Sequence, residues 1–129
     1  MGIFNEDERE ITCVYNGENY TDQQTLAYLK ASEKSLLDID ITKTKVTGTQ
    51  WADLASRLNT SINSLLNEQE VEGDLSAFNE NDCITLLREE PKVLNGAIVF
   101  TADKAKQVKN PSTVLEFIET DSEGIPKPY

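Results

Sequence analysis

The sequence contains no histidine. This absence excludes Ser-His-Asp and Cys-His catalysis, histidine general bases and most transition-metal sites, because imidazole is the usual base or ligand in all of them. The six glycines are scattered along the chain, so none of the glycine-rich phosphate-binding motifs can be written from them. We therefore expect neither a metal nor a nucleotide cofactor.

Basic residues are also scarce, with 12 lysines and arginines against 23 acidic residues and a net charge of −11. A nucleic-acid phosphate backbone would be repelled by most of such a surface, so we expect no nucleic-acid binding. A basic protein partner would complement this charge. The acidity also has a simpler use, because it keeps a protein soluble.

Long hydrophobic runs are missing, and the acidic start "MGIFNEDERE" lacks the basic and apolar regions of a signal peptide. These features predict a cytoplasmic protein that does not associate with a membrane. Two cysteines, Cys13 and Cys83, are too few for a disulfide scaffold in a chain of 129 residues. Both lie within apolar patterns, so we expect both thiols to be buried and not bonded to each other.

The first third of the chain has the pattern of a strand, a helix and a second strand. Ile11–Tyr15 is apolar and rich in β-branched residues, and residues 36–41 alternate apolar and acidic side chains. Between them, Thr21 and Gln24 have the spacing of a capping box, which predicts a helix over about residues 22–33.

The remainder of the chain predicts helices first and then a hairpin. Trp51 and Leu54 fall on one face of a helix that follows residues 47–49, and "SINSLL" continues that helical pattern. An asparagine cap and a terminal proline predict a further helix over about residues 79–90. The last elements predicted are strands over residues 96–100 and 105–109, joined by a turn, and a helix over residues 110–118 with Pro111 in its first turn.

This order of elements predicts an α/β fold. A βαβ unit places its two strands parallel, and a closing hairpin adds antiparallel strands. The economical assembly is a thioredoxin-like mixed four-stranded sheet with flanking helices and a helical insertion after the second strand. We predict one domain over residues 1–129, with a flexible arm at 1–10 and a mobile tail at 119–129.

Three groupings of side chains have both a functional and a structural interpretation. Asp38 and Asp40 share one face of a predicted strand, as an acid–base pair would, but the outward face of an edge strand accounts for them. Trp51 would suit a binding anchor, yet its helical spacing with Leu54 and Ala55 favours packing. The third grouping is an acidic loop that lacks the spacing of a calcium-binding loop and is predicted to be solvated. Its carboxylates are Glu68, Glu70, Glu72 and Asp74.

Three stretches together resemble one known family. They are "YNGENYTDQQTL" at 15–26, "EEPKVLNGAIVF" at 89–100 and "VKNPSTVLEFI" at 108–118. Their order and spacing are similar to the arsenate reductase (ArsC) and Spx-type branch of the thioredoxin superfamily, and the helical middle of the chain fits that family's insertion. The resemblance covers about residues 11–118.

The resemblance implies a site whose chemistry is missing. In that family a cysteine opens the first helix, its thiolate attacks arsenate, arginines neutralise the oxyanion, and glutathione or glutaredoxin reduces the adduct. The nucleophile position is Asn19 here, and an amide cannot act as a thiolate does. At the other positions, arginines are replaced by Gln23, Asn67 and Gly96, the family's proline is replaced by Ala97, and only Lys109 keeps a positive charge.

Two functions follow from the resemblance. One is a catalytically inactive ArsC-like protein that acts as a protein-binding or regulatory module, as Spx-type relatives do by binding RNA polymerase. The other is a thiol-linked oxidoreductase of the ArsC or glutaredoxin type with a different nucleophile.

The charges near the helix start favour the inactive protein, because we expect Glu18 and Asp22 to repel an oxyanion there. A carboxylate about 5 Å away opposes an anion by roughly 3 kcal/mol, against roughly 0.3–1 kcal/mol of attraction from the helix dipole.

Overall fold

The fold is described here from a computed structural model, over residues 10–119. The predicted N-terminal arm and C-terminal tail therefore lie almost wholly outside the described residues. In chain order the helices and strands are β1 (Ile11–Tyr15), α1 (Tyr20–Ala31), β2 (Leu36–Asp40), α2 (Gly48–Arg57), α3 (Glu80–Glu89), β3 (Ala97–Phe100), β4 (Ala105–Val108) and α4 (Leu115–Glu119). Short 3₁₀ turns lie at Asn63–Leu65, Glu68–Glu70, Leu75–Ala77, Pro91–Val93 and Pro111–Val114.

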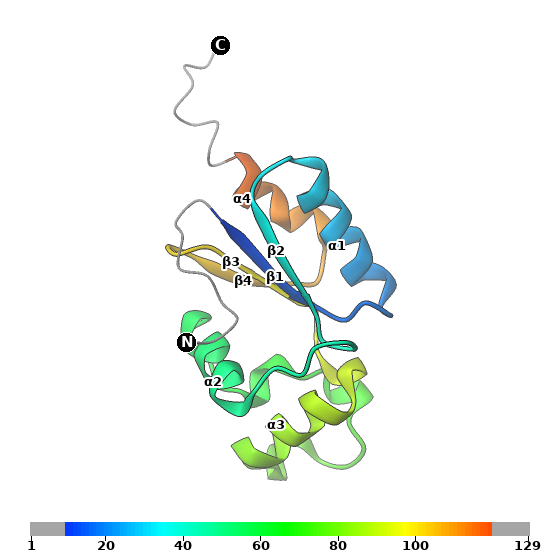
Figure 1. The fold of residues 1–129 in the computed structure, drawn as a ribbon. Helices are drawn as coiled ribbons and strands as arrows, with labels where there is room; N and C mark the ends of the chain where they lie inside the picture. The colour runs from blue at the N-terminus through cyan, green and yellow to red at the C-terminus, as the bar shows by residue number, and fades with distance from the viewer. Residues whose placement is uncertain (1–9, 120–129) are drawn as a thin grey trace.

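The four strands form one mixed sheet in the order β2-β1-β3-β4 (Figure 1). β1 and β2 are parallel, as the crossover through α1 requires. β3 is antiparallel to both β1 and β4. The predicted thioredoxin-like sheet, with its parallel pair and its closing hairpin, is confirmed. None of the helices within residues 10–119 is both long and apolar enough to cross a membrane.

Helices cover both faces of the sheet, because side chains on a strand alternate between its faces. Cys13 of β1 packs with the inner side of α1 and with α4, whereas its neighbour Val14 packs with α2 and α3 on the opposite face. Figure 1 shows α1 and α4 on one side of the strands and α2 and α3 on the other. Cys83 of α3 belongs to the same cluster as Val14, so the sheet separates the two thiols. Both cysteines are buried and free, as predicted.

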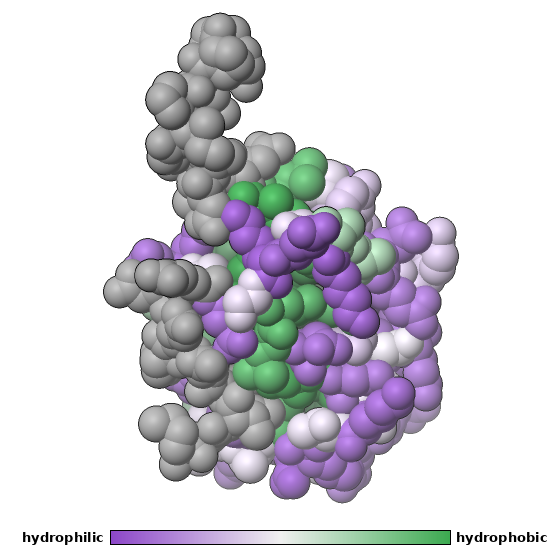
Figure 2. All heavy atoms as spheres, turned by 45° about the horizontal axis from the view of Figure 1, so that its top comes forward, coloured by the Kyte–Doolittle hydropathy of each residue, from purple (hydrophilic) through white to green (hydrophobic). Residues whose placement is uncertain are grey.

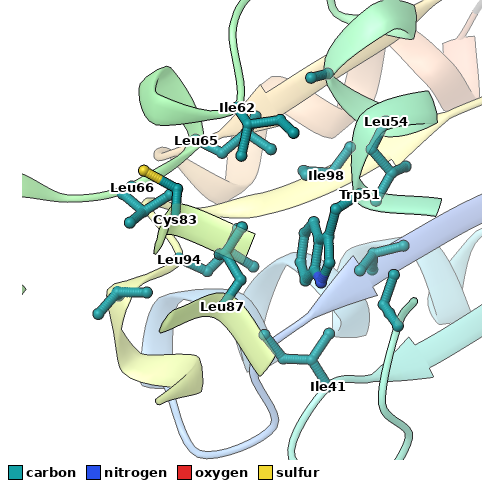
Figure 3. Close-up of a cluster of buried hydrophobic side chains, with 14 of the residues drawn as sticks. Ile41, Trp51, Leu54, Ile62, Leu65, Leu66, Cys83, Leu87, Leu94 and Ile98 are labelled. Atoms are coloured by element: carbon teal, nitrogen blue, oxygen red, sulfur yellow. The ribbon is translucent and has the colours of Figure 1, made fainter. Parts of the chain in front are cut away.

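Trp51 anchors the inserted helices on the sheet. Figure 3 shows its indole ring close to Ile98 of β3 and Leu87 of α3. Its side chain is completely buried, so the packing interpretation is correct. Its indole N–H has no hydrogen-bond partner in the described structure, which means that apolar burial holds it there.

Two predicted helix boundaries are wrong. α1 begins at Tyr20, and its N-cap is Asn19, whose side chain accepts a hydrogen bond from the Asp22 N–H; Thr21 is therefore inside the helix. The "SINSLL" segment forms only the 3₁₀ turn Asn63–Leu65, because Leu66 leaves the helical path to make a β-bridge with Leu94. The first of these corrections bears directly on the candidate site.

Candidate functional site

A polar pocket of about 180 Å³ opens beside the start of α1. It lies where that helix meets two 3₁₀ turns, the chain before β3 and the chain after β4. Its walls are formed by Asn19, Thr21, Asp22, Asn67, Glu70, Lys92, Leu94, Asn95, Gly96 and Lys109. Four of the six positions that the resemblance singles out, Asn19, Asn67, Gly96 and Lys109, are thus brought together. Ala97 and Gln23 lie outside the pocket wall, and Gln23 donates its side-chain amide to the Gly17 carbonyl.

The loop between β1 and α1 uses its own backbone donors. The Asn16 N–H donates to Asp22 at 2.9 Å, and the Glu18 N–H donates to the Asn16 side chain at 2.8 Å. The Asn19 N–H donates to the Asn16 carbonyl at 3.0 Å. In a phosphate- or oxyanion-binding loop such N–H groups point at the ligand. In this loop they hold the loop itself together.

Gly17 is required in this loop because the Asp40 carboxylate takes the space of a side chain. A Cβ at this position would lie 2.0 Å from an Asp40 oxygen. Asp40 accepts hydrogen bonds from the Gly17 N–H at 3.0 Å and from the backbone and hydroxyl of Thr42. Burial alone would raise the pKa of Asp40, but these hydrogen bonds lower it below its ordinary value. Asp40 therefore has a structural role, and the acid–base pairing with Asp38 finds no support.

Asn19 acts as a helix cap at the position where the resemblance implies a nucleophile. Its side-chain oxygen accepts the Asp22 N–H at 2.9 Å, and its backbone carbonyl accepts the Gln23 N–H at 3.0 Å. Across the pocket, Asn67 caps the turn Glu68–Glu70 in the same way by accepting the Gln69 N–H at 2.9 Å. Because each amide oxygen is bound to its own helix or turn, each amide group offers the pocket an NH₂ donor.

Asp22 lies in the wall of the pocket and is only 2% exposed. Burial raises the pKa of its carboxyl from 3.8 to about 6, even though hydrogen bonds from the backbone N–H groups of Asn16 and Ala97 lower it. The site therefore contains a carboxyl group that titrates close to neutral pH. From the sequence, Asp22 was expected to repel an oxyanion and not to be buried, because nothing in its local pattern indicates burial.

The charges around the pocket differ from those expected. The wall contains two lysines, Lys92 and Lys109, and its carboxylates are Asp22 and Glu70. Glu18 is exposed and does not line the pocket, so the repulsion expected from it stays a prediction. Sequence reasoning did not identify Lys92 as a site residue. It lies in the 3₁₀ turn Pro91–Val93, and the residues around it in the sequence do not indicate that it lines a pocket.

Gly96 has a backbone conformation that excludes the arginine implied by the resemblance. Its φ of +112° disfavours any side chain, and a Cβ there would lie 2.4 Å from the Val108 carbonyl oxygen. The next residue, Ala97, follows a trans peptide bond and donates its N–H to Asp22. A proline at position 97 would remove this donor. This part of the wall therefore requires a glycine at position 96 and a residue with a free backbone N–H at position 97.

Neither cysteine is placed to act as a thiolate nucleophile in the pocket of this structure. Burial raises the pKa of the Cys13 thiol far above its ordinary value, and the carboxylates of Asp22 and Asp38 raise it further. Burial and the nearby charges of Asp82 and Glu80 likewise raise the pKa of Cys83. Both thiols have no exposed surface and do not line the pocket. No cysteine side chain therefore lines this pocket.

The acidic loop over residues 68–74 shows no sign of a cation site. Its four carboxylates are exposed, and Asp74 caps the turn Leu75–Ala77 by accepting the Ser76 N–H at 3.0 Å. Within residues 10–119, no three acidic or cysteine side chains come close enough to hold a metal ion.

The protein is similar to known proteins in its fold and not in its sequence. No protein-family model and no curated protein sequence matches the chain. An arsenate reductase from Vibrio cholerae superposes with a TM-score of 0.68 at 18% identity, over 85% of this chain and 98% of that one. A Yersinia pestis protein named provisionally as an arsenate reductase gives 0.67 at 19% identity, over 82% and 98% of the two chains. The chain has the fold of arsenate reductases. Since both identities are below one in five, the likeness concerns the fold.

Proposed function

We propose that this protein is an arsenate-reductase-like protein that has lost the thiol chemistry and acts as a non-catalytic, regulatory binding module. The main support for the proposal is the role of Asn19 as the N-cap of α1. The side chain at the expected nucleophile position is an amide, and its oxygen is hydrogen-bonded to the Asp22 N–H at the start of α1. It can cap a helix, but it cannot form and release a covalent adduct with arsenic or sulfur.

The rest of the site supports the same proposal. The backbone donors of the β1–α1 loop are bound within the loop, and both thiols are buried outside the pocket. No side chain in the pocket wall replaces the thiol, because none of the lining residues is a cysteine. A threonine hydroxyl needs an adjacent base or metal to act as a nucleophile, and the sequence offers no histidine for that role.

A basic protein partner is part of this proposal. The net charge of −11 would steer such a partner towards the protein. Figure 2 shows one face on which a band of hydrophobic atoms is bordered on its right by hydrophilic residues. Apolar patches on a protein surface often mark protein-binding sites.

Arsenate reduction by purified wild-type protein, assayed with glutathione and glutaredoxin, tests the proposal. We expect no turnover above a protein-free blank. The Asn19→Cys variant is a matched partner for this assay, since it places a thiol at the exposed start of α1. We expect it to remain inactive as well, because Gln23, Asn67 and Gly96 supply no positive charge for the oxyanion. Turnover by the wild type would overturn the proposal and favour the oxidoreductase alternative.

A further inference from the structure

The pocket beside α1 is lined by charges of both signs that do not neutralise one another. Lys92 and Lys109 contribute positive charge, and Asp22 and Glu70 contribute negative charge. The ion pairs found within residues 10–119 join other residues, and none links these four groups. In a protein with so many surplus carboxylates, two lysines without an acidic partner at one pocket are unexpected.

The neutral groups of the wall reinforce the positive side. Asn19 and Asn67 have their amide oxygens bound to their own helix or turn, so each offers an NH₂ group to a ligand. Together with the two lysines, these amides make a set of donors suited to a carboxylate.

The negative side of the pocket includes a buried acceptor. Asp22 already accepts two backbone N–H groups, but a carboxylate can accept about four hydrogen bonds, so it keeps capacity for a ligand. Buried carboxylates are stabilised by a paired cation, and Asp22 has no cationic partner within the described part of the chain. A ligand ammonium group would supply that missing charge.

We propose that this pocket binds a small zwitterion of the α-amino-acid type, with its carboxylate toward the lysines and amides and its ammonium group toward Asp22 and Glu70. The pocket volume of about 180 Å³ leaves room for a small amino acid. The inference deepens the proposed function, since it takes the pocket as a binding site rather than a reaction site.

Isothermal titration calorimetry with defined probes tests the ligand class. The probes are L-alanine and L-serine, then propionate and ethylamine, each of which carries only one of the two charges, and inorganic phosphate. We expect at least one amino acid to bind reversibly, with propionate, ethylamine and phosphate each at least tenfold weaker. Equal or tighter binding of propionate or phosphate would overturn the proposal in favour of a plain anion site, and no binding of either amino acid would overturn it outright.

Substitutions assign the binding to this pocket. Lys109→Gln and Lys92→Gln change exposed side chains and should leave the fold intact, while each weakens amino-acid binding severalfold. Lys30→Gln, in the last turn of α1, is the matched control and should bind as the wild type does. Unchanged affinity in both pocket variants would overturn the assignment. Because these titrations contain no arsenate or thiol, their failure would leave the result of the reductase assay standing.

Discussion

Replacement of Asp22 by asparagine should change how the stability of the protein depends on pH. In the folded protein the pKa of Asp22 is raised from 3.8 to about 6, chiefly by burial. The folded state therefore holds this proton more tightly than the unfolded chain does. The stabilisation that results is complete only below the unfolded pKa of 3.8 and is lost as the pH rises through 6.

The size of the effect follows from the shift in pKa. A shift of about two units corresponds to about 3 kcal/mol between the fully protonated and fully ionised limits. Between pH 4 and pH 7.5 the contribution of Asp22 should fall by about 2 kcal/mol, since part of the change lies below pH 4. The asparagine of the variant has no proton to exchange, so this part of the pH dependence should disappear. Its amide cannot accept as many backbone N–H groups as the carboxylate, which lowers the stability by a constant amount at every pH.

Urea unfolding at both pH values provides the measurement, with tryptophan fluorescence as the signal. Trp51 is the single tryptophan and is completely buried, so its emission reports the loss of the core. The stability of Asp22→Asn relative to the wild type should rise by about 2 kcal/mol from pH 4 to pH 7.5. Asp103→Asn, in the exposed turn between β3 and β4, is the control and should show a much smaller change. Equal behaviour of the two variants would refute the assignment of a buried, ionisable Asp22.

Three further predictions concern the cysteines, the loop and the cap. Cys13 and Cys83 should react slowly with a thiol reagent under native conditions, whereas the Asn19→Cys thiol should react at least tenfold faster; rapid labelling of the wild type would contradict their burial. Gly17→Ala should lower the unfolding free energy by about 1–3 kcal/mol because its methyl group overlaps Asp40. Gly48→Ala, where a Cβ meets only an ordinary contact with Ile84, should be neutral or stabilising, and equal losses in the two variants would count against the close approach at Gly17. Asn19→Ala should cost about 1 kcal/mol through loss of the N-cap. Asn19→Asp should keep the wild-type stability, and a loss as large as that of alanine would argue against capping.

The fold could be predicted from sequence because its main signals are local. The apolar runs of β1 and β3 and the capping asparagine of α3 appear in the structure as the pattern indicates. The start of α1 was misplaced because Asn19 and Thr21 are both good caps. The loop before α1 is also held by a contact that no local pattern shows, the hydrogen bond from the Gly17 N–H to Asp40 on another strand.

The site could be predicted only in part. The resemblance brings Asn67, Gly96 and Lys109 to one place although they are far apart in sequence, and the pocket wall contains all three. The positive φ of Gly96 and the burial of Asp22 depend on packing against β4 and the loop before α1, so they were not foreseen.

We propose that the start of α1 holds a binding pocket and no reactive thiol. Intact-mass spectrometry of the native protein provides the test, after incubation with arsenate and reduced glutathione and, separately, with oxidised glutathione. Asn19→Cys serves as the positive control, because its exposed thiol should form a mixed disulfide with oxidised glutathione. The mass of the wild-type protein should stay unchanged under both conditions. A glutathione or arsenic adduct on Cys13 or Cys83 in the folded wild-type protein would contradict it.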